Sequence, residues 1–344
     1  MRPLDIRFRP LNLPLADPFG ISSRVTAVAE NVLVEIEQDG LIGYGECAPK
    51  AYYGESQASV LAWLPRLLAV VADREPADIH GAAAAMEHAC AENPAARAGV
   101  EQALWDLLGK RLGIPVRNLW GIGPRCVTSS YTIGIDTPPR MAQKAHEAAE
   151  YPLLKIKVGT PNDVENLRAV REARPDARIQ VDANGAWTAK AAIRSIEQLE
   201  AFNIEMVEQP VAPPDIDGLA AVAASTHLPV FADESCHGAR DVPRVADACD
   251  GVVVKIQKAG GLLAALQHIH AARANGLQVM LGCMVESSLG ISAAGQIAPL
   301  CDLLDLDGNL LLSSDPFDGL RASRGEVHPP LGPGLGATRT VDES

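Results

Sequence analysis

Lysines and carboxylates recur in this sequence at the ends of short apolar segments. In LLKIKVG (153–159), Lys155 and Lys157 lie two residues apart in a run that otherwise predicts a β-strand. Because side chains alternate between the two faces of a strand, both ammonium groups point the same way. Two buried cations on one face repel each other and lose hydration, which is unfavourable without compensating charge. The pair therefore indicates that negative charge lies opposite it.

Candidate compensating groups stand at the ends of the apolar runs that follow. RIQVDAN contains Asp182, IEMVEQP contains Glu208, PVFADES contains Asp233, and GVVVKIQ adds a further amine, Lys255. Three carboxylates from three consecutive strands form an all-oxygen ligand set that suits Mg²⁺, with positions left for water and substrate. A single charged residue at a strand end is usually a solvated loop residue or a helix N-cap. Charges at matching positions on five successive strands favour a functional site.

These charges need a framework that brings strand ends together. Eight apolar, β-branched runs begin at residues 128, 153, 178, 204, 229, 251, 276 and 303, and helical patterns with apolar residues three and four apart lie between them. Alternation at this pitch predicts βαβ units with parallel strands, and eight strands predict closure into a (β/α)8-type barrel. The alternative is an open doubly wound sheet, but no GxGxxG motif follows a strand to favour it. In such a barrel, catalytic groups lie at the C-terminal ends of the strands.

The first third of the chain has a different pattern. LDIRFRPLNLPL, AVAENVLVEIEQDG and LIGYGECAP predict an antiparallel meander with a turn at Asp39-Gly40, and helical segments such as ARAGVEQALWDLLGKRLG follow it. Residues 1–120 are thus expected to form an α+β capping domain, and residues 121–312 the barrel that carries the catalytic residues. The Gly- and Pro-rich residues 313–344 are expected to return to the capping domain.

Composition excludes several classes of partner. The 344-residue chain has a formal net charge of −13, which argues against nucleic acid and anionic membrane surfaces. No apolar run approaches the ~20 residues of a membrane span, and the N-terminal stretch lacks the apolar core of a secretory signal. The seven cysteines form no CxxC pair, as expected of buried free thiols in a reducing cytoplasm. We therefore expect a cytoplasmic protein with a small-molecule substrate; a homo-oligomer is compatible with the sequence, which does not specify an oligomeric state.

Taken together, the motifs resemble the enolase superfamily, in its muconate lactonizing enzyme subgroup. The resemblance covers nearly the whole chain and rests on GYGECAP, ALWDLLGKRLGIPV, KIKVG, VDANGAW, VEQP, ADES, VVVKIQKAGG and GCMVESSLGISAA, in this order. It implies a (β/α)7β-type TIM barrel with an N-terminal α+β capping domain. It also implies one Mg²⁺ per active site, with three ligands, Asp182, Glu208 and Asp233. Glu234 follows a ligand but faces the other way by strand alternation, which predicts a structural or supporting role.

The same resemblance implies that Lys157 and Lys255 are an acid/base pair on opposite faces of the substrate's α-carbon, with Lys155 supporting the developing enolate. The chemistry is consistent with this assignment. Removing a proton next to a carboxylate creates a dianionic enolate, which a metal ion and a nearby ammonium stabilise as it forms. A lysine that accepts the proton must be neutral, so its pKa must fall toward ~7–8 through burial and nearby positive charge. Two lysines on opposite faces invert the stereochemistry.

The last barrel strand bears on the substrate. LLDLDGNLLLSSDPF carries Asp305 and Asp307 two residues apart, so both point toward one pocket. This DxD resembles the dipeptide-epimerase motif, in which two carboxylates hold the free ammonium of an N-terminal residue. A turn at Asp307-Gly308 would explain Asp307 alone. Muconate and succinylbenzoate have no ammonium, and their negative charge would be repelled here.

Residues of the capping domain and of the strand-seven loop complete the expected site. The stretch ADPFGISSRVTAV predicts a mobile loop over the barrel mouth, and by resemblance its Arg24 binds the side-chain carboxylate of glutamate, although a loop arginine is usually only solvated. In APKAYYGES, Tyr52 or Tyr53 is expected to close the pocket. Further candidates for substrate contact follow strand seven, Cys283 and Glu286, the latter with loop packing as its alternative.

These features favour an isomerase, a dipeptide epimerase of the L-Ala-D/L-Glu type acting on cell-wall-derived dipeptides. An N-acylamino acid racemase, an o-succinylbenzoate synthase, or an epimerase of other dipeptides would use the same lysines. No histidine follows the seventh strand, which disfavours acid-sugar dehydration. A non-catalytic scaffold is the remaining alternative, and the full set of expected ligands and lysines argues against it.

Overall fold

The computed structural model describes residues 4–340, and the N-terminal part of the fold is built on an antiparallel sheet in the order β1-β2-β3. Its elements are β1 (Asp5–Ile21), β2 (Arg24–Gln38), β3 (Leu41–Cys47), η1 (Ala51–Tyr53), α1 (Gln57–Val71), α2 (Ile79–Ala89), α3 (Pro94–Leu112) and α4 (Val116–Leu119). Asp39 and Gly40 have φ values of 52° and 82°, as a tight turn between β2 and β3 requires. The predicted meander and its turn are confirmed.

Helix α3 is the central helix of this part and is buried over almost its whole circumference. It begins after Asn93, whose side chain accepts a hydrogen bond from a backbone N–H of the first turn, and it ends at Gly113 in the left-handed conformation. Strand β3 packs directly on it, because a Cβ placed on Gly45 would lie 1.9 Å from the carbonyl oxygen of Gly99. This close contact fixes the end of β3, which leads into the barrel mouth.

The barrel sheet has eight parallel strands in the order β5 to β12. They are β5 (Tyr131–Ile133), β6 (Leu153–Lys157), β7 (Arg178–Asp182), β8 (Ile204–Glu208), β9 (Val230–Ala232), β10 (Gly251–Val254), β11 (Gln278–Gly282) and β12 (Leu303–Asp305). The backbone N–H of Ser130 donates to the carbonyl of Leu304 (3.0 Å), which brings the two ends of the sheet together in a nearly closed ring. The predicted eight-stranded barrel is confirmed.

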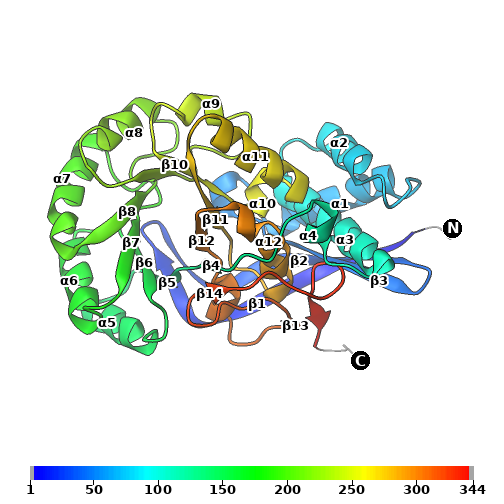
Figure 1. Cartoon of the computed structure of the whole chain (residues 1–344), viewed down its shortest axis with the longest axis horizontal. Helices are drawn as coiled ribbons and strands as arrows, with labels where there is room; N and C mark the ends of the chain where they lie inside the picture. Colours follow the sequence, from blue (N-terminus) through cyan, green and yellow to red (C-terminus); the bar gives the residue numbers. More distant parts are fainter. Residues whose placement is uncertain (1–3, 341–344) are drawn as a thin grey trace.

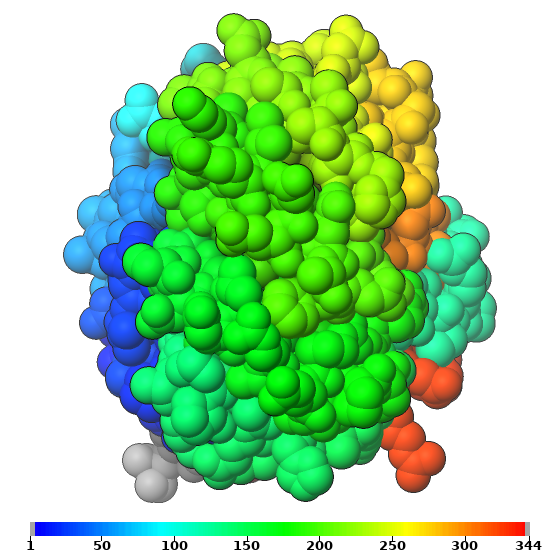
Figure 2. All heavy atoms as spheres, turned by 90° about the vertical axis from the view of Figure 1, so that its left-hand side faces the viewer, coloured from blue at the N-terminus to red at the C-terminus, as the bar shows by residue number. Residues whose placement is uncertain are grey.

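Helices surround this sheet (Figure 1). They are α5 (Pro138–Glu147), α6 (Asp163–Ala173), α7 (Ala189–Leu199), α8 (Ile216–Ala223), α9 (Val242–Val245), α10 (Ile256–Ala259), α11 (Leu262–Ala274) and α12 (Ser288–Gly295), with short turns η2 (Glu200–Phe202), η3 (Ala298–Leu300) and η4 (Gly308–Leu311). In α7, the buried residues Ala192, Ile196 and Leu199 recur at helical spacing and face the sheet side. Figure 2 shows the outer face, with the blue N-terminal strands along its left edge. Among residues 4–340, no helix is both long and apolar enough to cross a membrane.

The register of the barrel strands places the charged residues at one level. Lys157 pairs with Asp182 on the neighbouring strand, and Asp182 pairs with Glu208 on the next. Each of these residues is the last of its strand. Asp233 and Lys255 follow directly after the ends of β9 and β10. The C-terminal ends of the parallel strands therefore carry the predicted catalytic groups at the same end of the barrel.

The β1–β2 hairpin reaches the barrel mouth. The sequence predicted a mobile loop for ADPFGISSRVTAV, but most of this stretch forms the ends of β1 and β2, with Ile21 paired to Arg24. The tip is held against the barrel, since the N–H of Ile135 donates to the carbonyl of Gly20 (2.8 Å). Pairing between two long strands, with one register shift between Pro14 and Phe19, replaces the predicted loop. The blue strands can be followed toward β5 and β6 in Figure 1.

The C-terminal part contacts both the barrel and the N-terminal sheet and helices. It contains β13 (Phe317–Asp318), β14 (Glu326–Val327) and β15 (Thr338–Arg339), and β14 pairs with β4 (Val127–Thr128) just before the barrel. The N–H of Leu335 donates to the Asp106 carboxylate on α3 (2.8 Å). The N–H of Val116 donates to the carbonyl of Gly334 (2.9 Å). The boundaries at residues 120 and 312 stay predictions.

Candidate active site

Lys155 is fully buried in the barrel and lies among three carboxylates. Its Nζ is 2.7 Å from Asp305 Oδ2, 2.8 Å from Glu208 Oε2 and 3.2 Å from Asp182 Oδ2. Burial alone would lower the pKa of this lysine, but the three carboxylates outweigh that effect and hold its pKa well above the ordinary value. Lys155 is therefore a fixed positive charge at the centre of the barrel.

Lys157 points toward the same carboxylate as Lys155. Its Nζ lies 2.5 Å from Asp182 Oδ2. Burial would raise the pKa of Asp182, but Lys157 and Lys155 more than reverse this and lower it below the usual range. The two lysines of one strand face are therefore tolerated because Asp182 stands between them, as the alternation of LLKIKVG predicted.

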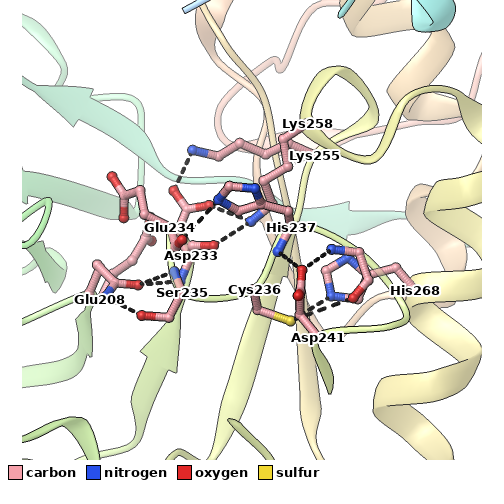
Figure 3. A network of polar contacts seen from close by, with 12 residues as sticks. Glu208, Asp233, Glu234, Ser235, Cys236, His237, Asp241, Lys255, Lys258 and His268 are labelled. Carbon is pink, nitrogen blue, oxygen red and sulfur yellow. Dashed lines mark hydrogen bonds and ion pairs between the residues drawn. The ribbon is translucent and has the colours of Figure 1, made fainter. Parts of the chain in front are cut away.

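Two further lysines hold Asp233, as Figure 3 shows. Lys255 Nζ lies 2.7 Å from Oδ2, and Lys258 Nζ lies 2.6 Å from Oδ1. Burial opposes ionisation of Asp233, but these cations lower its pKa below the usual range. For Lys255, burial acts to lower the pKa, and Asp233 reverses this and raises the pKa well above the ordinary value, which is opposite to the fall expected from the sequence for a proton-accepting lysine. The pair Lys255–Asp233 mirrors the pair Lys157–Asp182.

The order of the strands places the two pairs across the barrel from each other. Strand β6, which ends at Lys157, and strand β10, which precedes Lys255, are four positions apart in a nearly closed ring of eight. Strands β7, β8 and β9 between them carry the three carboxylates. Strands β11, β12 and β5 form the other half of the ring. A substrate in the mouth would therefore have an amine on each side.

The three carboxylates fit a divalent cation chemically. Within residues 4–340, the buried Oε1 of Glu208 has no partner, and the buried Oε2 has only the ion pair with Lys155 (2.8 Å). Burial, followed by the charges of Asp182 and Asp233, raises the pKa of Glu208 to about 8. Glu208 Oε1 is therefore free to accept, within an all-oxygen set of the kind that Mg²⁺ prefers, as far as the described residues show. The ligand oxygens of the three carboxylates do not all lie within 4.8 Å of one another. Asp182 and Asp233 instead form ion pairs with lysines.

In the described chain, one trio of Cys, His, Asp or Glu residues has ligand atoms that all lie within 4.8 Å of one another, and it lies away from the barrel mouth. It consists of Cys126, Glu326 and His328, beside strands β4 and β14, and all three residues are exposed. It is separate from the strand ends that carry the charged cluster.

Asp305 and Asp307 differ in environment. Asp305 accepts hydrogen bonds from the hydroxyls of Ser130 (2.7 Å) and Thr132 (3.1 Å). Burial opposes its ionisation, but Lys155 prevails and lowers its pKa. Asp307 accepts from the N–H of Thr132 (2.5 Å), and burial and the charge of Asp305 raise its pKa to about 7. Asp307 thus lacks a compensating cation of its own, which is the setting that a substrate ammonium would relieve.

Lys157, Lys255, Asp305 and Asp307 line one cavity at the barrel mouth, and the predicted metal ligands and Lys155 lie outside its lining. The volume of the cavity is about 830 Å³ including its open side. Several residues predicted from the sequence line it together, Arg24, Tyr52, Tyr53, Lys157, Lys255, Cys283, Asp305 and Asp307. Burial, and then Asp307 and Asp305, raise the pKa of the Cys283 thiol well above its ordinary value, so it is a neutral wall group.

Glu286 lies outside the lining of this cavity. Its Oε2 accepts from the side-chain amide of Gln257 (2.7 Å) and its Oε1 from the N–H of Met284 (2.9 Å). Both oxygens are thus engaged inside the protein. Of the two alternatives that the sequence left, this geometry favours loop packing.

Glu234 was expected to face away from the site, and this expectation is wrong. Strand β9 ends at Ala232, so strand alternation does not extend to Glu234, and its side chain lines the cavity. Asn184 donates to its Oε1 (3.0 Å), while Oε2 has no hydrogen-bond partner among the described residues. The turn after the strand sets the direction of this carboxylate.

Three polar residues of the site were not predicted from the sequence. Lys50 lines the cavity, Thr132 holds both DxD carboxylates, and Lys258 bonds to Asp233. Lys258 lies three residues beyond Lys255 in VVVKIQKAGG, a spacing that one helical turn would bring to the same side. Lys50 and Thr132 had no comparable signal, because each acts through neighbours distant in sequence.

Family models match both parts of the chain. Residues 4–121 match the N-terminal domain of mandelate racemase / muconate lactonizing enzyme, and residues 140–343 match an enolase C-terminal domain-like model. The chain is 38% identical to an L-Ala-D/L-amino acid epimerase of Pedosphaera parvula, over 94% of this chain and 95% of that protein. It is 36% identical to an L-Ala-D/L-Glu epimerase of Bacteroides thetaiotaomicron, over 98% of this chain and 88% of that protein.

A solved structure agrees with these relatives. The dipeptide epimerase of Enterococcus faecalis V583, complexed with Mg and the dipeptide L-Leu-L-Tyr, superposes with a TM-score of 0.92 at 33% identity. The match covers 98% of this chain and 100% of that chain. The chain therefore belongs to the mandelate racemase / muconate lactonizing enzyme family of the enolase superfamily, where it is similar to dipeptide epimerases.

Proposed function

We propose that this isomerase is a Mg²⁺-dependent dipeptide epimerase, which moves the α-proton of the C-terminal residue of a dipeptide between two lysines. The leading substrate is L-Ala-D/L-Glu. The observation that carries the proposal is the placement of Lys157 and Lys255 on strands four positions apart in the ring, with the three carboxylates on the strands between them. The names of the similar epimerases support the same reaction class.

In this proposal, Asp182, Glu208 and Asp233 would hold the ion, which would supply positive charge to stabilise the enolate that forms when the α-proton leaves. One lysine accepts that proton when its Nζ is neutral, which requires a weaker pairing with its aspartate than this structure shows. The electron pair of the broken C–H bond stays on the substrate. The other lysine, starting as an ammonium, donates a proton to the opposite face of the same carbon. The α-carbon is inverted, and the two lysines have exchanged protonation states.

Lys155 has a supporting role in the proposed reaction. Its ammonium is fixed by buried carboxylates, so it remains charged while its neighbours titrate. A permanent cation beside a developing negative charge stabilises it more in the transition state than in the ground state. We therefore assign Lys155 to charge stabilisation and not to proton transfer.

Asp305 and Asp307 account for the choice of a dipeptide with a free amino terminus. Both line the cavity, and Asp307 has no cation of its own within hydrogen-bond distance in the described chain. A substrate ammonium would supply that charge and form charge-assisted hydrogen bonds with both carboxylates. An N-acylated amino acid has no such group, which separates this proposal from the N-acylamino acid racemase and o-succinylbenzoate synthase alternatives.

Deuterium incorporation tests the reaction directly. The enzyme with Mg²⁺ in D₂O is expected to exchange and epimerise the α-proton of the second residue of L-Ala-L-Glu, as followed by NMR. Asp307→Asn should weaken turnover of this dipeptide but have little effect on any residual activity with N-acetyl-L-glutamate, because Asp305 is paired with Lys155 whereas Asp307 has no ion pair among the described residues. Absence of exchange with every member of a dipeptide library would refute the proposal, and equal losses on both substrates would remove the ammonium role. A cell-wall origin of the dipeptides and a cytoplasmic location stay predictions.

A further inference from the structure

Lys50 is a cavity residue that the proposed reaction does not use. It follows β3 and precedes η1, and its carbonyl oxygen accepts from the N–H groups of Tyr53 (2.9 Å) and Glu55 (3.2 Å). These bonds fix the backbone at the point where the side chain enters the cavity. Arg24, at the start of β2, lines the same cavity. Two separate segments of the capping domain therefore each place a cation in the lining of this cavity.

Neither cation has a partner. Within residues 4–340, the side-chain nitrogens of Lys50 and Arg24 form no hydrogen bond and no ion pair. The charged neighbours of Lys50 are Arg24 and Lys255, which repel it, and Glu286, which attracts it. Glu286 is already bonded through both oxygens to Gln257 and Met284. Positive charge therefore exceeds negative charge at this wall of the cavity.

Lys50 and Arg24 are two neighbouring cations, as Lys155 and Lys157 are, but they differ in one respect. Two neighbouring cations in a partly desolvated place are unfavourable unless an anion lies between them. In the barrel, Asp182 is that anion. Between Lys50 and Arg24 the described part of the chain supplies none, so a ligand is the group that can complete the set. In the proposed reaction, the C-terminal carboxylate of the dipeptide faces the metal ligands. The remaining anionic group that could lie between Lys50 and Arg24 is a side-chain carboxylate of the second residue.

We propose that Lys50 is a specificity-determining residue that, beside Arg24, binds the side-chain carboxylate of the dipeptide's second residue. This inference rests on the proposed epimerase function. It assigns opposite charges to the two recognition elements: β12 supplies carboxylates for the substrate ammonium, and the cap supplies cations for the acidic side chain. The substrate class is then a dipeptide with glutamate, or another acidic residue, in second place.

The test compares L-Ala-L-Glu with L-Ala-L-Gln, which differ only in the side-chain charge. Wild-type kcat/KM should favour the Glu dipeptide, and Lys50→Met should lower the Glu/Gln ratio by about tenfold or more, because a charge-assisted hydrogen bond is lost. Lys50→Arg should retain most of the preference. Lys190→Met is the matched control, since Lys190 is exposed and lies outside the cavity lining. Thermal melts of all variants verify folding.

The two proposals fail in different ways. If the wild type epimerises neither dipeptide, the proposed function is wrong, and the Glu/Gln ratio is then read from calorimetric Kd values of the Mg²⁺-loaded protein. A ratio that is unchanged in Lys50→Met overturns the role of Lys50 while leaving epimerisation intact. A wild type that prefers or equally accepts the Gln dipeptide overturns it as well, and so does failure to bind either dipeptide.

Discussion

Buried charges at this site exist in mutually dependent sets. Lys155 touches Asp182, Glu208 and Asp305, and its ammonium favours the ionised form of each of these buried carboxylates. Removing one member of such a set leaves the others buried without compensation, which costs more than the pair contributes. A substitution here changes both the charge of the site and the stability of the chain. Mutational tests therefore need a readout that separates chemistry from folding.

Substitution of either proposed base provides such a readout. Lys157→Ala and Lys255→Ala should each reduce epimerisation by at least about 10²-fold, the usual scale of general acid–base catalysis. Each variant retains the lysine on the other side, so it should still exchange the α-proton of one stereoisomer with D₂O. The measurement is NMR exchange on the L,L and L,D substrates separately. Near wild-type epimerisation by either variant would show that the two-base assignment is wrong.

The pH dependence of specificity should report Lys50. Burial, and then the charge of Arg24, lowers the pKa of Lys50 to about 8. The ammonium is therefore present below pH 8 and is lost as the pH rises above it, while a glutamate side chain stays ionised throughout. The other charged groups facing Lys50 are Glu286 and Lys255, with the Cys283 thiol nearby.

We expect the wild-type Glu/Gln ratio of kcat/KM to fall as the pH rises through about 8, and to stay flat in Lys50→Met. Taking the ratio of two substrates removes the titration of the catalytic lysines, which affects both equally. A falling ratio that persists in the methionine variant would assign the effect to another group.

At the scale of elements, each part of the site depends on how two segments meet. The β1–β2 hairpin carries Arg24 and is secured through Gly20, whose carbonyl accepts from Ile135 N–H. A Cβ on Gly20 would lie 2.5 Å from the carbonyl oxygen of Ile135. Such a clash with backbone cannot be relieved by a side-chain rotation, so the hairpin tip would have to move. The glycine is required by close approach and not by a positive φ.

Gly20→Ala should therefore displace Arg24 and raise KM for L-Ala-L-Glu several-fold, with a smaller effect on kcat. The thermal midpoint should change little, because the tip is at the edge of the fold and the core of the barrel is untouched. Gly123→Ala is the control, since no atom lies within 4 Å of a Cβ placed there. Equal KM values for both variants would show that the hairpin tip tolerates the added methyl group.

At the scale of the molecule, a buried polar network joins the cap to the barrel. The Glu46 carboxylate at the end of β3 accepts from Asn31 in the cap (2.7 Å) and from the N–H of Ser287 at the start of α12 (3.0 Å). Gln257, after β10, donates to the Glu46 carbonyl (2.9 Å) and accepts from Ala48 N–H (3.0 Å). Lys50 follows shortly after these residues, so the cap side of the cavity is positioned by the barrel itself.

Mg²⁺ should stabilise the whole chain, since the native state brings the three carboxylates to one end of the barrel and the unfolded chain does not. At an ion concentration about 100 times Kd, the gain is about 2.7 kcal/mol, which corresponds to a rise of several degrees in Tm. Calorimetry with and without EDTA measures it. Glu208→Gln should abolish most of the Mg²⁺-dependent rise, while Glu326→Gln, at the separate exposed cluster, should not. An equal rise in all three proteins would place the ion elsewhere.

The sequence by itself determined the parts of this protein that depend on local periodicity. Alternation in LLKIKVG required the two lysines to share a face, and the spacing of eight apolar runs favoured a parallel barrel over an open sheet. In a parallel barrel the strand ends converge, so the strand-end positions of Asp182 and Glu208 followed without knowledge of any contact. The family resemblance added the reaction, and the comparisons agree with it.

Tertiary structure alone decided what happens beyond the strand ends. Glu234 turns into the cavity because β9 stops two residues earlier, and Glu286 turns away because Gln257 and Met284 engage it. Lys50 and Arg24 meet only because a cap loop and a hairpin tip converge on the same mouth. Strand direction is a local property with a period of two, whereas loop direction depends on contacts between residues far apart in the chain. No local pattern encodes those contacts.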